Sequence, residues 1–255
     1  NWRMLAITAD STYADLFEQT LYNGVLPGIS LEGTEYFYTN PLRKVKGYTE
    51  ELRWSKTREP NIQYSFCCPP NVVRTIAQVQ NHVYTLSEDT LWVHLYGASE
   101  LDTTWEEGDR IRVSQETEWP WDGRVRLTIR EAPGHPVRVK LRIPAWATPG
   151  ENVVSLNGKA LDRDPRPGTY FTVEGNFNPG DTISLDVPFR ATLYEAHPFA
   201  EEIRDQVAVR YGPLVYCVES NDLPDGVAID AVALSRESLL QPARREPIRI
   251  ANTTV

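Results

Sequence analysis

The spacing of apolar residues changes at about residue 89, and this change restricts the fold more than any other feature of the chain. Before it, apolar residues recur at alternating intervals of four and three, which predicts a helix that begins at Pro69-Pro70. The buried stripe of this helix is expected to be Val72, Ile76, Val79, Val83 and Leu86. After residue 89, apolar and polar residues alternate, as they do in strands with one face buried and one in water. The arginines that alternate in 124–130 and 138–142 are therefore predicted to form a solvated face.

Two further local patterns complete this outline. A helix is predicted near the start, where Ser11 or Thr12 can serve as N-cap and Asn23-Gly24 as the stop. Its apolar face is expected to be Tyr13, Leu16, Phe17 and Leu21. Asn157-Gly158, between two strand-like runs, predicts a tight hairpin. Short strands at this spacing favour antiparallel β-sandwiches.

The predicted fold class is α plus β, with several domains. Two helices cannot bury their own faces and also build a core, so residues 1–88 are expected to be the C-terminal part of a larger helical domain. Residues 89–190 are predicted to form a β-sandwich. Residues 191–255 are predicted to start a second β-sandwich, which can be incomplete at its end.

Composition and charge exclude several classes of partner. Asp and Glu number 35 against 26 Lys and Arg, a net charge of −9, which argues against nucleic acid and anionic membranes. No apolar run reaches the roughly 18–20 residues that a membrane-spanning helix needs. Three cysteines are too few for a disulfide framework, and an unbridged thiol pair favours a reducing cytoplasm. The oligomeric state stays open, a homo-oligomer included.

The adjacent pair Cys67-Cys68 is the main candidate for chemistry. It stands directly before the predicted second helix, and a helix N-terminus favours a thiolate, which can act as a nucleophile or as a soft metal ligand. Two buried structural cysteines are the competing interpretation. A tetrahedral zinc site needs four ligands, of which the two cysteines would supply two. The histidines are interpreted as structural or surface residues and do not supply the other two. These histidines are His82, His94, His135 and His197. Cys217, in an apolar strand, is expected to be a buried core residue.

A carboxylate and aromatic stretch offers weaker candidates. Glu32 and Glu35 lie beside Tyr36 and Tyr38, and glycosidases use carboxylates next to the scissile bond. An ordinary surface role is favoured for either glutamate. The tyrosines could stack on a sugar or offer it a hydroxyl, although core packing explains them equally well. The motifs HExxH, GxSxG and the phosphate-binding P-loop are absent from the sequence.

Four stretches together resemble a known family. They are NWRM at 1–4, GTEYFYTNPL at 33–42, CCPPN at 67–71 followed by Arg74, and YGPLVYCVE at 211–219. The chain resembles the β-L-arabinofuranosidases of glycoside hydrolase family 127. The resemblance implies the end of an (α/α)6 catalytic barrel followed by β-sandwich domains, and a retaining exo-glycosidase that uses zinc and acts on an oligosaccharide or glycoside. It further implies that Cys67 is the nucleophile and a zinc ligand, that Cys68 is a zinc ligand, and that Tyr36 binds substrate.

The sequence also departs from the pattern of that family. The remaining zinc ligands, a cysteine and a glutamate, and the acid/base glutamate of the family would lie before Asn1. We therefore expect a C-terminal fragment that is inactive as an isolated chain of 255 residues. The alternatives are a non-catalytic carbohydrate-binding or structural β-sandwich module and a zinc-stabilised interaction module.

Overall fold

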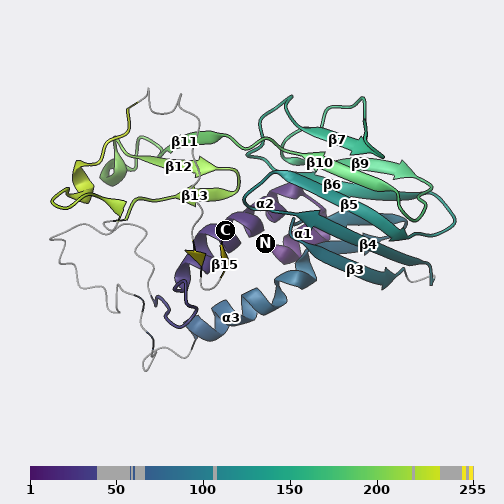
Figure 1. Ribbon diagram of the computed structural model, residues 1–255, viewed down its shortest axis with the longest axis horizontal. Helices are drawn as coiled ribbons and strands as arrows, with labels where there is room; N and C mark the ends of the chain where they lie inside the picture. The colour runs from purple at the N-terminus through teal and green to yellow at the C-terminus, as the bar shows by residue number, and fades with distance from the viewer. Residues whose placement is uncertain are drawn as a thin grey trace. The chain divides into compact units, whose positions relative to one another are not determined.

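Figure 1 shows the protein as a computed structural model. The structure describes residues 1–38, 58, 60, 67–105, 108–219, 222–235, 249–250 and 253–254. The chain divides into two compact units. The first comprises Asn1–Thr20, Gln78–Arg190 and Tyr211–Leu214, and the second comprises Leu21–Ala77, Ala191–Arg210 and Val215–Val255. No helix in the described part is long and apolar enough to cross a membrane.

The first unit combines two α-helices and one 3-10 turn with two sheets. Its helices are α1 (Trp2–Thr8), α2 (Ser11–Thr20) and the 3-10 turn η3 (Val79–His82). One sheet has the strand order β1-β2-β6-β9, built from β1 (Tyr84–Ser87), β2 (Thr90–Val93), β6 (Val137–Ile143) and β9 (Thr169–Gly175). The other has the order β3-β4-β5-β10-β7-β8, built from β3 (Ser99–Thr104), β4 (Arg110–Thr117), β5 (Arg124–Glu131), β10 (Thr182–Asp186), β7 (Val153–Leu156) and β8 (Lys159–Ala160).

Alternation along the strands places one apolar face of each sheet in the core, as the period of two predicts. In the first sheet the buried apolar residues are Leu91, Val93, Val137, Val139, Leu141, Ile143, Phe171 and Val173. In the second they are Ile111, Val113, Val125, Leu127, Ile129, Val154, Ile183 and Leu185. The predicted hairpin is also confirmed, because Asn157 and Gly158 both have positive φ, at 51° and 77°, between the paired strands β7 and β8.

One strand pair differs from the expected antiparallel pattern. β2 and β6 run parallel, whereas the other neighbours in these two sheets are antiparallel. Parallel neighbours need a long connection. Here β3, β4 and β5 form that connection and contribute to the other sheet. The predicted α plus β class is confirmed, and its sheets are mostly antiparallel.

The remaining elements lie wholly or mainly in the second unit. They are η1 (Leu21–Val25, a π-turn), η2 (Leu26–Gly28), α3 (Cys68–Gln78), β11 (Ala191–Glu195), η4 (Glu201–Ile203), β12 (Val207–Tyr211), β13 (Leu214–Tyr216), η6 (Ile229–Ala231), β14 (Arg249–Ile250) and β15 (Thr253–Thr254). β11, β12 and β13 form one small sheet in that order, and β14 pairs with β15.

The helical pattern predicted up to Leu86 is wrong for its last part. α3 ends at Gln78, and Tyr84–Ser87 form strand β1, in which Leu86 pairs with Leu91 of β2. A spacing of three and four cannot distinguish a helix from a helix followed by a short strand. Pairing with β2 makes these residues a strand, because the preference for a strand depends on neighbouring strands more than on intrinsic propensity.

The buried face of α2 also differs from the prediction. Its buried residues are Ser11, Ala14 and Glu18, whereas Leu16 is 41% exposed. Asp10 provides the cap, since the Thr12 amide donates to Asp10 Oδ1 at 2.9 Å. The packed face of α2 is therefore small and polar, and its buried carboxylate requires partners.

Arg142 of β6 supplies the main partner and lies inside the unit rather than on the predicted solvated face. Its guanidinium is fully buried and forms ion pairs with Asp15 and with Glu18, the latter at 2.6 Å. The Glu18 carboxylate also accepts hydrogen bonds from the indoles of Trp119 and Trp146, each at 3.1 Å. Burial alone would lower the pKa of Arg142, but the charges of Glu18 and Asp15 outweigh burial and raise it. The guanidinium therefore stays charged and holds α2 on the sheet.

His94 lies next to this network and is 3% exposed. Its Nδ1 is 2.5 Å from the Tyr170 hydroxyl, and its Nε2 is 2.7 Å from Thr85 Oγ1. Burial, followed by the charge of Arg142, lowers the pKa of His94 to about 4. This confirms the structural role predicted for His94.

His94 makes the stability of the protein fall as the pH is lowered. The unfolded side chain takes up its proton near pH 6.5 and the folded one near 4, so stability from neutral His94 is complete above pH 6.5 and is lost toward pH 4. Between pH 7 and 4.5 we expect a loss of about 2 kcal/mol from this group. Denaturant unfolding at both pH values should show a correspondingly smaller loss for His94→Gln. The raised pKa of Asp15 acts in the opposite direction but is common to both proteins. Identical pH dependence in the two proteins would contradict the assignment.

Candidate active site

The two adjacent cysteines lie at the N-terminus of α3. The Asn71 amide donates to the Cys67 carbonyl at 3.0 Å, which makes Cys67 the cap and Cys68 the first helical residue. Pro69 and Pro70 then occupy the first turn, where the missing amide hydrogens cost no helical hydrogen bond. The predicted start of this helix is thus confirmed to within a residue.

The side chains of the pair lie close together and reach solvent. Cys67 Sγ and Cys68 Sγ are 3.7 Å apart, Cys67 is exposed, and neither thiol is in a disulfide. The Asn71 side-chain amide donates to the Cys67 carbonyl at 2.8 Å, and Arg74 donates to the Asn71 side chain. The Arg74 guanidinium is therefore held beside Asn71, whose own side chain contacts the Cys67 carbonyl.

The separation of the two sulfur atoms fits a shared metal ion. Two thiolates bound to one tetrahedral zinc at about 2.3 Å lie roughly 3.8 Å from each other. The pair therefore matches half of a zinc shell in donor type and spacing. Within the described residues, no group of three or more histidines, cysteines and carboxylates could hold a metal. The described part of the chain thus offers two of the four ligands.

Tyr36, the predicted substrate-binding residue, lies on a separate turn. It pairs with Ile29 in an isolated β-bridge, is half-buried, and donates its hydroxyl to the Gly33 carbonyl at 3.3 Å. Glu32 is exposed and Glu35 is half-buried. The end of the predicted motif, residues 39–42, lies outside the described residues.

The prediction for Cys217 is wrong. The residue follows the short strand β13 and is exposed, as are its neighbours Val215, Tyr216 and Val218. Partial burial still raises the pKa of the Cys217 thiol, and the charges of Glu219 and Asp222 add to this effect. An apolar sequence indicated a core strand, but a strand of three residues at this position in the second unit buries few of its side chains.

His82 has a structural role, as predicted. Its ring packs between Trp2 and Phe17, with centroid distances of 4.3 and 5.2 Å, and burial lowers its pKa. The residues that sequence reasoning missed are Asp15, Glu18 and Arg142. The polar interruption of the apolar pattern in 11–20 signalled Asp15 and Glu18, whereas no pattern in the sequence signalled the burial of Arg142.

Protein-family models of one family match most of the chain. Residues 1–81 match the model of the β-L-arabinofuranosidase GH127 catalytic domain, and residues 90–189 match that of the GH127 middle domain. Residues 191–251 match the glycoside hydrolase family 127 C-terminal domain. The three models describe consecutive domains of one glycoside hydrolase family. The chain belongs to glycoside hydrolase family 127.

Individual relatives agree with this assignment. The chain is 32% identical over 231 residues to a non-reducing end β-L-arabinofuranosidase of Bifidobacterium longum. The aligned region covers 87% of the chain and 34% of the relative. A solved glycoside hydrolase is 45% identical with a TM-score of 0.85, over 90% of the chain and 38% of that structure. A GH127 β-L-arabinofuranosidase from Geobacillus stearothermophilus T6 is 34% identical with a TM-score of 0.76, over 84% of the chain and 34% of that structure. The chain therefore spans about a third of the length of these relatives.

Proposed function

We propose that the full-length protein is a retaining exo-glycoside hydrolase that releases terminal β-L-arabinofuranose, or a similar sugar, through Cys67. The observation that carries the proposal is the pair of sulfur atoms 3.7 Å apart at the N-terminus of α3, within the segment that matches the catalytic-domain model. The printed names of the relatives support the choice of sugar. In this proposal residues 1–88 end an (α/α)6 barrel, and the two sheets of the first unit, each with a buried apolar face, support the predicted β-sandwich over 89–190.

Cys67 and Cys68 would hold a zinc ion together with ligands from outside the described residues. Both sulfur atoms have the softness and the spacing that zinc requires. When bound, zinc would keep the thiols deprotonated at neutral pH.

The proposed reaction proceeds by two displacements at the anomeric carbon. Cys67 Sγ attacks that carbon and displaces the aglycone oxygen, which takes a proton from an acid outside the described residues. The sugar is then held on Cys67 as a thioglycoside. Water attacks the same carbon, loses its proton to that group, and displaces the sulfur. Two inversions give net retention.

We expect the released L-arabinose to keep its anomeric configuration. Proton NMR of the product during turnover measures the configuration, and an inverted product would contradict the proposed reaction.

Tyr36 is proposed to contact the sugar. A half-buried tyrosine presents an apolar ring and a polar tip, and both features suit a sugar ring with its hydroxyls. The internal hydrogen bond to Gly33 holds the side chain in a defined position.

The zinc content of purified protein tests the metal assignment independently of activity. We expect about one zinc per full-length chain by elemental analysis. Cys68→Ala should weaken zinc binding at least about 100-fold, because even loss of an outer partner of a ligand costs about 10–100-fold. Cys217→Ala is the matched control, since Cys217 is also exposed but lies on another segment. Equal zinc content in both variants would contradict the assignment.

A further inference from the structure

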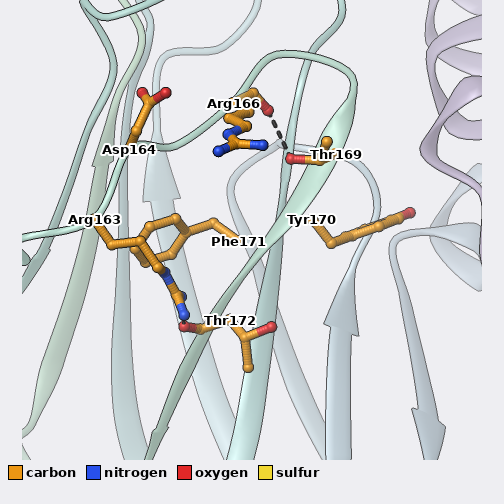
Figure 2. Close-up of a pocket in the computed structure, with 7 residues that line it drawn as sticks. All are labelled: Arg163, Asp164, Arg166, Thr169, Tyr170, Phe171 and Thr172. Atoms are coloured by element: carbon orange, nitrogen blue, oxygen red, sulfur yellow. Dashed lines mark hydrogen bonds between the residues drawn. The ribbon is translucent and has the colours of Figure 1, made fainter.

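A partly open pocket lies on the first unit beside β9, the edge strand of its four-stranded sheet (Figure 2). Its volume is about 290 Å³, just under the lower limit of small-molecule sites, which measure roughly 300–1,000 Å³. Its lining consists of Arg163, Asp164, Arg166 and the consecutive residues Thr169–Thr172. None of these residues belongs to the proposed active site.

The walls of the pocket are held by contacts within the unit. Arg163 lies over the Phe171 ring, 4.1 Å from its centroid, and donates to the Thr172 carbonyl. The Thr169 hydroxyl donates to the Arg166 carbonyl at 2.7 Å, as the dashed line in Figure 2 shows. The Tyr170 hydroxyl is bound to His94. The pocket is therefore largely preformed, which lowers the entropic cost of binding a ligand.

Two charged groups at one end of the pocket are available to a ligand. Asp164 and Arg166 lie at the upper end in Figure 2, whereas Arg163 and Thr172 lie at the lower end. Among the residues that the structure describes, the Asp164 carboxylate and the Arg166 guanidinium have no hydrogen-bond or ion-pair partner. The pocket thus offers a charged acceptor and a charged donor.

This combination selects the chemical class of the ligand. A sugar hydroxyl both donates and accepts, so neighbouring hydroxyls can donate to Asp164 and accept from Arg166. A phosphate would meet the two arginines but would be repelled by Asp164. An apolar ligand would interact with neither charge, and both belong to exposed residues.

We infer that this pocket is a second carbohydrate-binding site, which holds another sugar unit of the glycan that carries the terminal arabinofuranose. The neutral sugar class follows from the pocket itself, whereas the arabinose-containing glycan rests on the proposed function. Such a site adds affinity for long substrates by effective concentration and leaves the chemistry on short ones unchanged.

The test compares the double variant Asp164→Ala/Arg166→Ala with Arg126→Ala in the full-length protein. Arg126 is an exposed arginine of the other sheet, on β5. Two probes are used, a β-L-arabinofuranosyl oligosaccharide and an aryl β-L-arabinofuranoside with a single sugar. We expect the double variant to bind the oligosaccharide about tenfold more weakly by calorimetry and to keep the kcat and KM of wild type on the aryl glycoside. Arg126→Ala should match wild type with both probes.

The outcomes separate this inference from the proposed function. If the protein hydrolyses neither probe but its oligosaccharide binding is weakened in the double variant, the result supports the inference. The same result contradicts the proposed function. Hydrolysis with unchanged oligosaccharide affinity in the double variant overturns the inference alone. Titration with inorganic phosphate completes the test. If the double variant loses phosphate binding but keeps the oligosaccharide affinity of wild type, the pocket binds anions and the inference is overturned.

Discussion

Replacing Cys67 with serine is expected to lower kcat of the full-length protein between about 10³- and 10⁶-fold, the range found when a nucleophile is removed. A serine hydroxyl is not ionised near neutral pH and is a poor zinc ligand, so the residue loses both proposed roles at once. The substituted side chain sits on the exposed cap of α3, where serine is itself a good capping residue. A loss of folding is therefore not expected to explain the loss of turnover.

Two cysteine variants separate the nucleophile from a residue that only binds metal. Cys68→Ser should lose turnover through loss of zinc and should regain part of it in excess zinc, whereas Cys67→Ser should stay inactive at any zinc concentration. Cys217→Ser, on a distant part of the sequence, should retain turnover. Mass spectrometry of wild type quenched during turnover should locate the sugar adduct on the peptide that contains Cys67. A Cys67→Ser protein within tenfold of wild type would refute the nucleophilic role.

Removing Arg142 is expected to have the largest effect on stability. Arg142→Ala leaves the carboxylates of Asp15 and Glu18 buried without their cation, which typically costs about 3–5 kcal/mol of the free energy of unfolding. Without Arg142 the buried carboxylates can lose their charge by taking up protons at low pH. The loss in the free energy of unfolding should therefore be larger at pH 7 than at pH 5. Denaturant unfolding at the two pH values measures both effects.

Matched variants show whether the effect comes from the buried charge. Arg126→Ala removes an exposed arginine from β5 and should change stability by less than about 0.5 kcal/mol. Adding Asp15→Asn and Glu18→Gln to Arg142→Met should recover part of the loss, because no buried charge then lacks a partner. An Arg142→Ala protein as stable as Arg126→Ala would show that the network does not hold α2 in place.

Local patterns predicted much of the fold because they reflect constraints that act over a few residues. A period of two must bury one side of a strand, and Asn157-Gly158 suits the positive φ values of a tight hairpin. The site was predicted less completely. The resemblance to a known family identified Cys67 and Cys68 as candidate site residues. Their adjacency in the sequence did not show that their sulfur atoms lie 3.7 Å apart.

Arg138 and Arg142 show where sequence information ends. Both belong to β6 and to the same alternating face, and the sequence predicts one environment for both. Arg138 is partly exposed and pairs with Asp89, whereas Arg142 is fully buried between carboxylates of α2. Alternation assigns each side chain to one face of β6, because it follows from the geometry of a single strand. Which part of that face a helix covers depends on tertiary packing, because the covering is a contact between segments more than 120 residues apart.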